Sequence, residues 1–220
     1  MSKMQEKTNK AFTEVVFILD RSGSMSGLES DVIGSFNSTL KEQQEISQDI
    51  RLSTVLFDNK VEYLHAHKPV NKVKPITAKD YYVRGCTALI DALGTAIDDM
   101  IDRQKNPETR AQKVLFIVNT DGYENASQDY TAREVKRMLE LQQKVYGWEF
   151  LFLGANIDSV ETATQYGFKE ERVSNYVNDT KGNQAKRKSE SRAILSYAQE
   201  GRICEDALEP ARADYAKRAR

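Results

Sequence analysis

Three short apolar runs, each stopped by a polar residue or a glycine, constrain the fold of this chain most strongly. They occupy residues 14–20, 114–118 and 148–153. A run of this length that is apolar at consecutive positions is typical of a strand with both faces buried. Amphipathic stretches lie between the runs. Strands that alternate with helices predict an α/β domain on a mostly parallel sheet.

The stretches between the runs show the spacing of helices. Apolar residues recur at helical intervals in 28–47, 87–103 and 131–146, and a shorter helix is predicted over 157–166. A last edge strand is predicted over 172–177. Helices that connect parallel strands cover both faces of the sheet, so we expect a Rossmann-like, doubly wound architecture.

One pair of strands departs from this parallel pattern. Residues 51–57 and 60–66 both have strand composition, and only Asp58 and Asn59 separate them. So short a connection predicts a hairpin, which places one antiparallel pair at an edge of the sheet.

The chain divides into three segments by composition. Residues 1–12 are polar, residues 13–177 carry the α/β pattern, and residues 178–220 form a charged extension. Two helices are predicted in the extension, over 181–199 and over 203–209 or beyond. Gly201 and Pro210 punctuate these helices. The first helix is expected to cover one face of the sheet. The part beyond Gly201 has two interpretations: it docks on another protein, or it belongs to the core.

Composition excludes several classes of protein. Lys+Arg number 32 against 33 Asp+Glu, and a net charge of −1 gives no electrostatic basis for general nucleic-acid binding. No apolar run approaches the roughly 18 residues of a membrane span, so no membrane association is expected. Two cysteines, Cys86 and Cys204, exclude a disulfide framework. We expect both thiols to be reduced and the protein to be cytoplasmic.

The loop after the first strand carries the most informative chemistry. Asp20, Ser22 and Ser24 present oxygen atoms at every second residue, and Gly23 lets the backbone turn between the serines. The carboxyl ends of the strands are the ligand-binding edge of an open α/β sheet. Alternating oxygen ligands there can converge on one hard cation.

Other motifs fail at this loop. A nucleophile elbow needs a serine where Met25 stands. A phosphate-binding loop needs the pattern G-x-x-x-x-G-K-[ST], and this loop has no lysine at the required place. The calcium-loop pattern also fails at Met25. The two histidines, His65 and His67, alternate on one predicted strand, and we interpret them as exposed edge residues rather than metal ligands.

Two later loops add oxygen ligands at the same predicted edge. Thr87 precedes a helix, and Asp121 follows the strand at 114–118 with Gly122 behind it. Each has an ordinary structural explanation, Thr87 as an N-cap and Asp121-Gly122 as a turn. The functional interpretation depends on all of them meeting in chain order at one edge.

With these residues in place, the chain resembles a von Willebrand factor A (vWA) domain with a metal-ion-dependent adhesion site (MIDAS), of the intracellular bacterial type. The family motif is D-x-S-x-S, then a threonine and then an aspartate on separate loops. The resemblance covers about residues 13–177. Cys86 departs from it, because the family commonly has glycine or another small residue there. The matching positions are Asp20, Ser22, Ser24, Thr87 and Asp121.

The resemblance implies that these five residues hold Mg²⁺, with Mn²⁺ or Ca²⁺ as alternatives. Two carboxylates offset the charge of a divalent ion, and three hydroxyls add none. The ion therefore stays electrophilic and can accept a carboxylate from outside, in exchange for one of its waters.

Two functions follow. The first is a binding module whose metal accepts an Asp or Glu of a partner protein, and the resemblance suggests an ATPase or a stress-response protein as that partner. The second is a metal-dependent hydrolase or phosphoryl-transfer enzyme, which needs a general base near the metal. Only Glu124 and Asp58 are candidates, and both are equally good rim residues. We expect binding rather than catalysis.

Overall fold

The computed structural model describes residues 11–46 and 49–218. Most of the predicted polar segment 1–12, and the last residue of the helix predicted over 28–47, lie outside them. The strands are β1 (Thr13–Asp20), β2 (Ile50–Phe57), β3 (Val61–Pro69), β4 (Lys113–Thr120), β5 (Glu149–Gly154) and β6 (Val173–Asn175). The helices are α1 (Glu29–Glu45), α2 (Leu89–Lys105), α3 (Ala132–Tyr146), α4 (Ser159–Gln165), α5 (Thr180–Glu200) and α6 (Glu209–Arg218), with short 3-10 turns at Gly23–Met25, Val70–Lys72 and Glu170–Arg172.

The six strands form one sheet in the order β3-β2-β1-β4-β5-β6. All neighbouring pairs are parallel except β2 and β3, which form the predicted antiparallel edge hairpin. From β1 the chain adds β2 and β3 on one side, then returns to place β4, β5 and β6 on the other side. The strand order therefore reverses between β1 and β4. The predicted α/β fold is confirmed.

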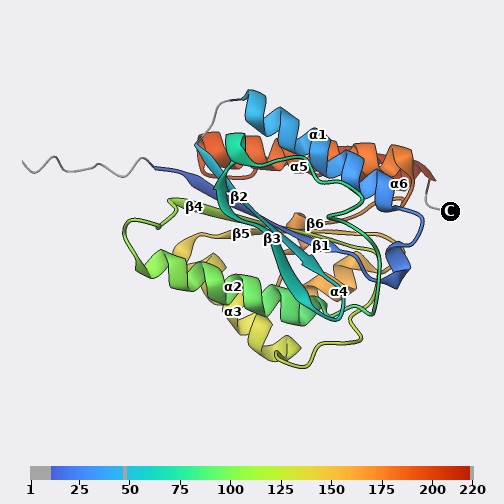
Figure 1. The fold of residues 1–220 in the computed structure, drawn as a ribbon, viewed down its shortest axis with the longest axis horizontal. Helices are drawn as coiled ribbons and strands as arrows, with labels where there is room; N and C mark the ends of the chain where they lie inside the picture. Colours follow the sequence, from blue (N-terminus) through green and yellow to red (C-terminus); the bar gives the residue numbers. More distant parts are fainter. Residues whose placement is uncertain (1–10, 47–48, 219–220) are drawn as a thin grey trace, which may run out of the picture.

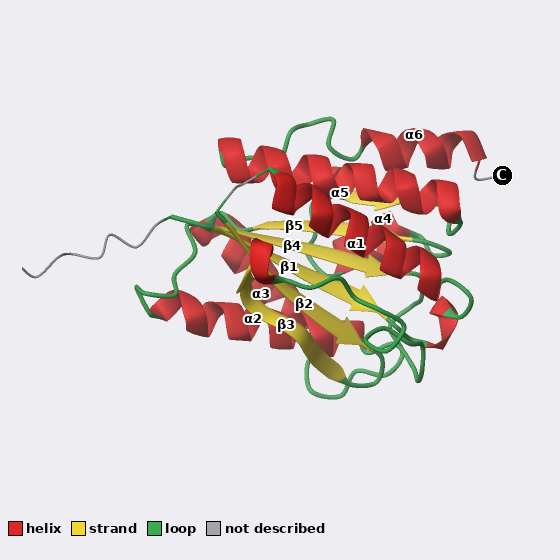
Figure 2. Ribbon diagram, turned by 45° about the horizontal axis from the view of Figure 1, so that its top comes forward, coloured by secondary structure: helices red, strands yellow, loops and turns green. Residues whose placement is uncertain are grey.

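Helices cover both faces of the sheet (Figure 1). On one face, α2, α3 and α4 enclose a core that includes Ile97, Leu139 and Ala163. On the other face, α1 and α5 enclose a second core that includes Phe36 and Ile194. Both faces of β1, β4 and β5 are therefore buried, which explains why these strands are apolar at consecutive positions. Figure 2 shows the parallel strands running to a common edge where several loops gather.

The C-terminal extension packs on the sheet domain. The predicted helix 181–199 is α5, and its Ile194 and Tyr197 are buried in the core beneath it. The second helix, predicted from 203 to 209 or beyond, begins later than expected: residues 203–208 are irregular, and α6 runs from Glu209 to Arg218. Pro210 lies in the first turn of α6, where its missing N–H is not needed, so it helps to start the helix that it was expected to interrupt. The division of the chain into a domain over 13–177 and an extension over 178–220 stays a prediction.

The prediction that both histidines are exposed at the sheet edge is wrong. A register irregularity in the β2–β3 pairing separates them. His65 is buried and stacks on Phe36 of α1, with ring centroids 6.4 Å apart. His67, at φ 51°, contacts Glu14 and Asp99 from the other side of the sheet. The bulge turns the two rings to opposite faces, so they do not form one exposed pair.

None of the helices within residues 11–46 and 49–218 combines the length and the apolar character that a membrane span requires.

Candidate metal-ion site

The candidate site lies where the strand order reverses. β1 ends at Asp20 and β4 ends at Thr120, so the loops that follow these two neighbouring strands emerge side by side. In open α/β sheets this is the position of the ligand-binding crevice. The topology therefore brings residues separated by about half of the chain to one point.

Asp20 lies at the base of the site and is only 1% exposed. Its Oδ1 accepts a hydrogen bond from the backbone N–H of Ser22 (2.7 Å), and its Oδ2 accepts one from the hydroxyl of Thr120 (2.6 Å). The Tyr81 hydroxyl donates to the backbone carbonyl of Asp20. Both carboxylate oxygens are thus held in one orientation.

The serines connect Asp20 to Asp121. The Ser22 and Ser24 hydroxyls lie 2.9 Å apart, and Ser24 donates to Oδ1 of Asp121 (2.6 Å). Ser22 and Asp121 are buried, whereas Ser24 is exposed. The D-x-S-x-S loop and the Asp121 loop therefore meet through side-chain hydroxyls, with an opening to solvent at Ser24.

Thr87 completes the cluster from the loop before α2. A Cβ atom placed on Gly122 would lie 3.0 Å from the Ser24 hydroxyl and 3.3 Å from the Thr87 hydroxyl. Only a residue without a side chain leaves these hydroxyls their places. Thr87 does not cap α2, because the N-cap is Ala88 and no side chain caps the helix. The ordinary structural explanation of Thr87 is therefore wrong.

Two asparagines support the ligand loops from outside the motif. Asn125 accepts a hydrogen bond from the Thr87 N–H at its Oδ1 (2.9 Å), and its own N–H donates to the Thr87 carbonyl. Asn178 donates from Nδ2 to Oδ2 of Asp121 (3.3 Å). Asn125 thus holds Thr87 by its backbone and leaves the hydroxyl free of this contact, and Asn178 binds the Asp121 oxygen that Ser24 does not.

The electrostatics of the cluster suit a cation. Burial raises the pKa of the Asp20 carboxyl, hydrogen bonds from Thr120 and Ser22 offset part of the rise, and the charge of Asp121 adds to it. Burial also raises the pKa of Asp121, against the hydrogen bond from Ser24. Among the described residues no Lys or Arg forms an ion pair with either carboxylate. A divalent ion would compensate both charges.

The donor set fits Mg²⁺ or another hard ion. It consists of oxygen atoms only, two from carboxylate side chains and three from hydroxyl side chains. The part of the chain described here contains no cluster of three or more His, Cys, Asp or Glu placed to hold a metal. A metal at this site therefore depends on the hydroxyls for most of its protein ligands, which leaves it electrophilic.

The basic residue inside the motif is directed away from the site. Arg21 is buried, and its guanidinium binds Asp58 (2.8 Å) and Glu62 (2.6 Å). Arg84 binds the same two carboxylates, at 2.7 and 2.8 Å. This four-residue network joins the loop after β1 to the β2–β3 hairpin. It keeps positive charge out of the cluster of ligands.

Both general-base candidates are engaged elsewhere. Asp58 accepts from Arg21, Arg84 and the N–H of Lys60. The Glu124 carboxylate accepts from the N–H groups of Ile90, Ala126 and Ser127 and from the Ser127 hydroxyl. Glu124 thus connects the start of α2 to the loop that carries Asp121.

A model of the von Willebrand factor type A domain matches residues 14–187. The chain belongs to this family. The match runs from β1 into α5 and includes all five residues of the vWA motif. A search of curated proteins found no match.

Solved structures share the vWA fold at low sequence identity. The PilB minor pilin from Streptococcus sanguinis has a TM-score of 0.58 and 14% identity, over 84% of this chain and 61% of the pilin. The ArnB paralog VWA2 from Sulfolobus acidocaldarius has a TM-score of 0.55 and 16% identity, over 83% and 45%. Proximal thread matrix protein 1 from the mussel byssus, with a zinc-occupied MIDAS motif, has a TM-score of 0.51 and 18% identity, over 75% and 41%. The vWA chain described here covers less than two thirds of the length of these proteins.

The sequence predicts the five ligand candidates but not the residues that fix their positions by hydrogen bonds. Thr120 gave a signal, because a threonine that ends an apolar strand directly before Asp121 is placed to reach the neighbouring strand. Tyr81, Asn125 and Asn178 gave none. Their contacts depend on how the loops fold back over the sheet edge, which no local pattern encodes.

Proposed function

We propose that this vWA chain is a divalent-metal-dependent protein-binding module. Asp20, Ser22, Ser24, Thr87 and Asp121 hold Mg²⁺, and the ion accepts an Asp or Glu carboxylate from a partner protein. The observation that carries the proposal is the convergence of these five residues at one sheet edge. Hydrogen bonds link Ser22, Ser24 and Asp121, Asp20 accepts from the Ser22 N–H, and the Thr87 hydroxyl lies beside Gly122 with that of Ser24. Among the described residues neither buried carboxylate has a basic partner. Mn²⁺ or Ca²⁺ could replace Mg²⁺, because both also prefer oxygen ligands.

Binding is favoured over catalysis by the engagement of Asp58 and Glu124. Each carboxylate is saturated by hydrogen bonds that organise loops, so neither is free to accept a proton from a water at the metal. We also propose that the module works in the cytoplasm beside an ATPase or a stress-response protein. Two free cysteines accord with a reducing compartment.

The test is retention of a partner that depends on both metal and site. Immobilised wild type and Asp121→Asn are exposed to host lysate with Mg²⁺ or with chelator, after calorimetry has established Mg²⁺ binding. We expect a partner held only by the wild type in Mg²⁺, and released by soluble glutamate-containing peptide. A protein retained equally by Asp121→Asn and in chelator would contradict the proposal. Mg²⁺-dependent turnover of a phosphatase substrate, lost in Glu124→Gln, would establish the enzymatic alternative.

A further inference from the structure

A segment beside the candidate metal site has a basic outer surface. Residues 70–82, here called the basic segment, follow the edge strand β3 and lead toward Thr87. Its apolar residues and its charged residues face opposite ways. Those buried against the α1 side of the sheet are Val70, Val73, Ile76 and Tyr81, and those exposed include Lys72, Lys74, Lys79 and Tyr82.

The basic segment is held in one conformation by α1. Asn37 binds both backbone groups of Ile76: its Oδ1 accepts from the N–H (2.8 Å) and its Nδ2 donates to the carbonyl (2.9 Å). Gln44 donates from Nε2 to the carbonyls of Val70 (2.9 Å) and Val73 (3.0 Å). An irregular segment anchored in this way presents its outward side chains from fixed positions, which lowers the entropic cost of binding.

The same segment is joined directly to the metal site. The Tyr81 hydroxyl donates to the backbone carbonyl of Asp20. Just beyond the segment, the Arg84 N–H donates to the Arg21 carbonyl (2.9 Å), and Gly85 accepts at its carbonyl from the Gly23 N–H (3.1 Å). The basic surface and the ligand loop therefore form one continuous edge.

The charge of this edge differs from that of the whole chain. The basic segment includes three exposed lysines, Lys72, Lys74 and Lys79, and one acidic residue, Asp80, although the chain as a whole has a net charge of −1. Within residues 11–46 and 49–218 none of these lysines forms an ion pair. Asp80 accepts two hydrogen bonds from Thr77. A fourth exposed lysine, Lys68, lies just before the segment in β3.

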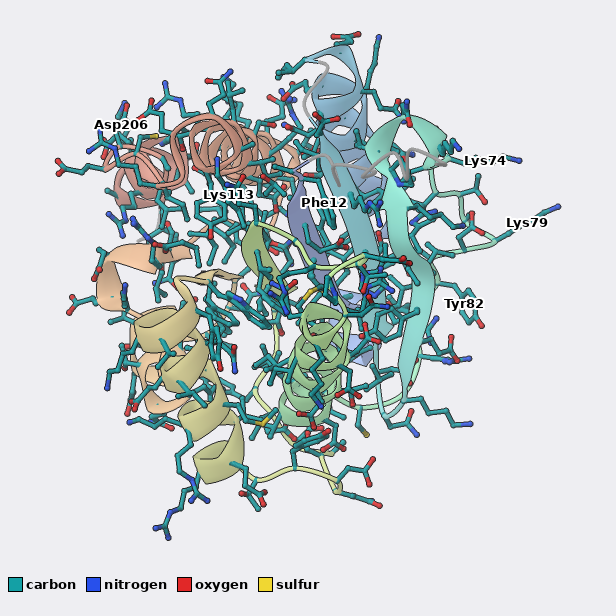
Figure 3. The ribbon with its side chains drawn as sticks, turned by 90° about the vertical axis from the view of Figure 1, so that its left-hand side faces the viewer. Phe12, Lys74, Lys79, Tyr82, Lys113 and Asp206 are labelled. Atoms are coloured by element: carbon teal, nitrogen blue, oxygen red, sulfur yellow. The ribbon has the colours of Figure 1, made fainter. Side chains whose placement is uncertain are left out.

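An exposed aromatic residue, Tyr82, follows these lysines in the chain and precedes Thr87. Tyr82 is 44% exposed, and the guanidinium carbons of Arg21 and Arg84 lie 5.5 and 5.4 Å from its ring centroid. These contacts hold the ring in place while one part of it stays open to solvent. Figure 3 shows Lys74, Lys79 and Tyr82 projecting outward from the same side of the molecule.

We propose that the basic segment is a docking surface for an acidic stretch of the partner protein. The inference rests on the proposed function: one carboxylate of the partner reaches the metal, Tyr82 packs against the adjoining residue, and further carboxylates lie along the lysines. A protein fits better than a nucleic acid, because the same ligand must supply a carboxylate and because the basic patch is local. Complementary charge of this kind accelerates encounter and selects among partners.

The test uses two synthetic peptides of equal length and compares their affinities in Mg²⁺ at low and high salt. One is a Gly/Ser peptide with a single glutamate, and the other has glutamate at every second position. We expect the acidic peptide to bind the wild type about tenfold more tightly at low salt and to lose most of that advantage at high salt. Lys72→Glu/Lys74→Glu/Lys79→Glu should abolish the advantage and leave single-glutamate binding unchanged.

A matched variant controls for total charge. Lys169→Glu/Lys188→Glu/Lys217→Glu alters three exposed lysines outside the basic segment by the same amount and should retain the advantage. Equal loss in both triple variants, or no loss in either, would overturn the proposal. An oligonucleotide that binds through the segment more tightly than the acidic peptide would also overturn it.

The two proposals fail in different ways. If the basic segment contributes nothing, single-glutamate binding still depends on Mg²⁺ and is lost in Asp121→Ala. If the metal does not accept carboxylates, the single-glutamate peptide fails to bind the wild type. In that case the acidic peptide still binds Asp121→Ala, and the segment variant removes this binding.

Discussion

The Ser24 hydroxyl donates a 2.6 Å hydrogen bond to Oδ1 of Asp121, a residue 97 positions further along the chain. The bond connects the loops that follow two neighbouring strands of the sheet. It joins the two loops directly, by a contact between two protein side chains. A metal that binds both oxygens would replace this bond with two metal–oxygen bonds, so the site needs little rearrangement to receive an ion.

The first prediction concerns the two carboxylates. Asp20→Asn and Asp121→Asn keep the shape of each side chain but remove the charge that offsets a divalent ion. Calorimetry should show Mg²⁺ and Mn²⁺ affinity reduced by at least about 100-fold in each variant, with the melting temperature of the metal-free protein nearly unchanged. Asp129→Asn, on the exposed part of the same loop, should bind normally. Undiminished affinity in either site variant would remove that residue from the site.

The second prediction concerns Gly122. In Gly122→Ala the new methyl group would meet the hydroxyls of Ser24 and Thr87, so at least one of them must move. We expect Mg²⁺ affinity to fall about tenfold or more, because displaced ligands coordinate poorly. Gly34→Ala is the control, since nothing lies within 4 Å of its new methyl group in α1. That change should leave Mg²⁺ affinity intact and stabilise the protein by about 0.5–1 kcal/mol. Equal Mg²⁺ affinity in both variants would contradict the assignment.

The third prediction concerns two buried charges on α5. Lys186 and Glu190 are 2% exposed and lie one helical turn apart. Burial lowers the pKa of Lys186 and raises that of Glu190, and each charge opposes the shift of the other. Lys186→Met removes the positive charge that lowers the pKa of Glu190 against the effect of burial. Urea denaturation at neutral pH should then show a loss of about 3–5 kcal/mol in the free energy of unfolding.

The double variant Lys186→Met/Glu190→Gln tests the cause of that loss. A neutral glutamine can still accept the hydrogen bond that Asn119 donates to Glu190 (2.9 Å). We expect most of the stability to return, because no uncompensated charge remains in the core. If the double variant is as unstable as Lys186→Met, the lysine acts through packing rather than through its charge.

The fourth prediction concerns the pKa of Asp179. Arg218 binds both of its carboxylate oxygens, at 2.6 and 2.9 Å, and holds the pKa of Asp179 at about 2, below the ordinary 3.8. A depressed carboxyl pKa stabilises the folded state above the unfolded value, and that contribution disappears as pH falls toward 2. Carbon-detected NMR titration should therefore show the Asp179 pKa rising toward 3.8 in Arg218→Ala. Arg192→Ala, which removes a separate ion pair with Asp206, should leave it unchanged.

The fifth prediction revises an expectation drawn from sequence. Docking on another protein was one of two interpretations of the part beyond Gly201, but Ile203, Ala207 and Leu208 are buried in this chain's own core. We therefore expect deletion of residues 203–220 to lower the free energy of unfolding by more than about 3 kcal/mol. Chemical denaturation measures it, with Lys217→Ala on the exposed part of α6 as a neutral control. A deletion variant as stable as the wild type would show that these contacts contribute nothing.

Sequence reasoning succeeded where one local signal determines the structure. The apolar strands β1, β4 and β5, the helices between them and the antiparallel hairpin all follow from periodicity and turn residues. The convergence of Asp20 and Asp121 follows as well, because parallel neighbouring strands end at one edge. Metal binding by the five residues stays a prediction.

Sequence reasoning failed where tertiary contacts override a local pattern. The irregular register of β2 and β3 turned His65 and His67 to opposite faces, and no residue pattern indicates such a bulge. Pro210 looked like the end of a helix because a proline in the first turn and a proline after the last turn are locally alike. Asn178, which reaches Asp121 from just before α5, could not be found without knowing where that helix packs.

The position of α5 in the chain has a consequence for synthesis. On the α1 side of the sheet, β4 and β5 are covered by Ile194 and Tyr197 of α5, a helix that follows all six strands in the chain. Until the ribosome has added α5, that surface remains open, and Asn119 and Thr39 lack the hydrogen bonds that they donate to Glu190. The nascent chain therefore cannot close its second core until α5 has emerged, and during that interval the bare sheet face is a natural substrate for chaperones.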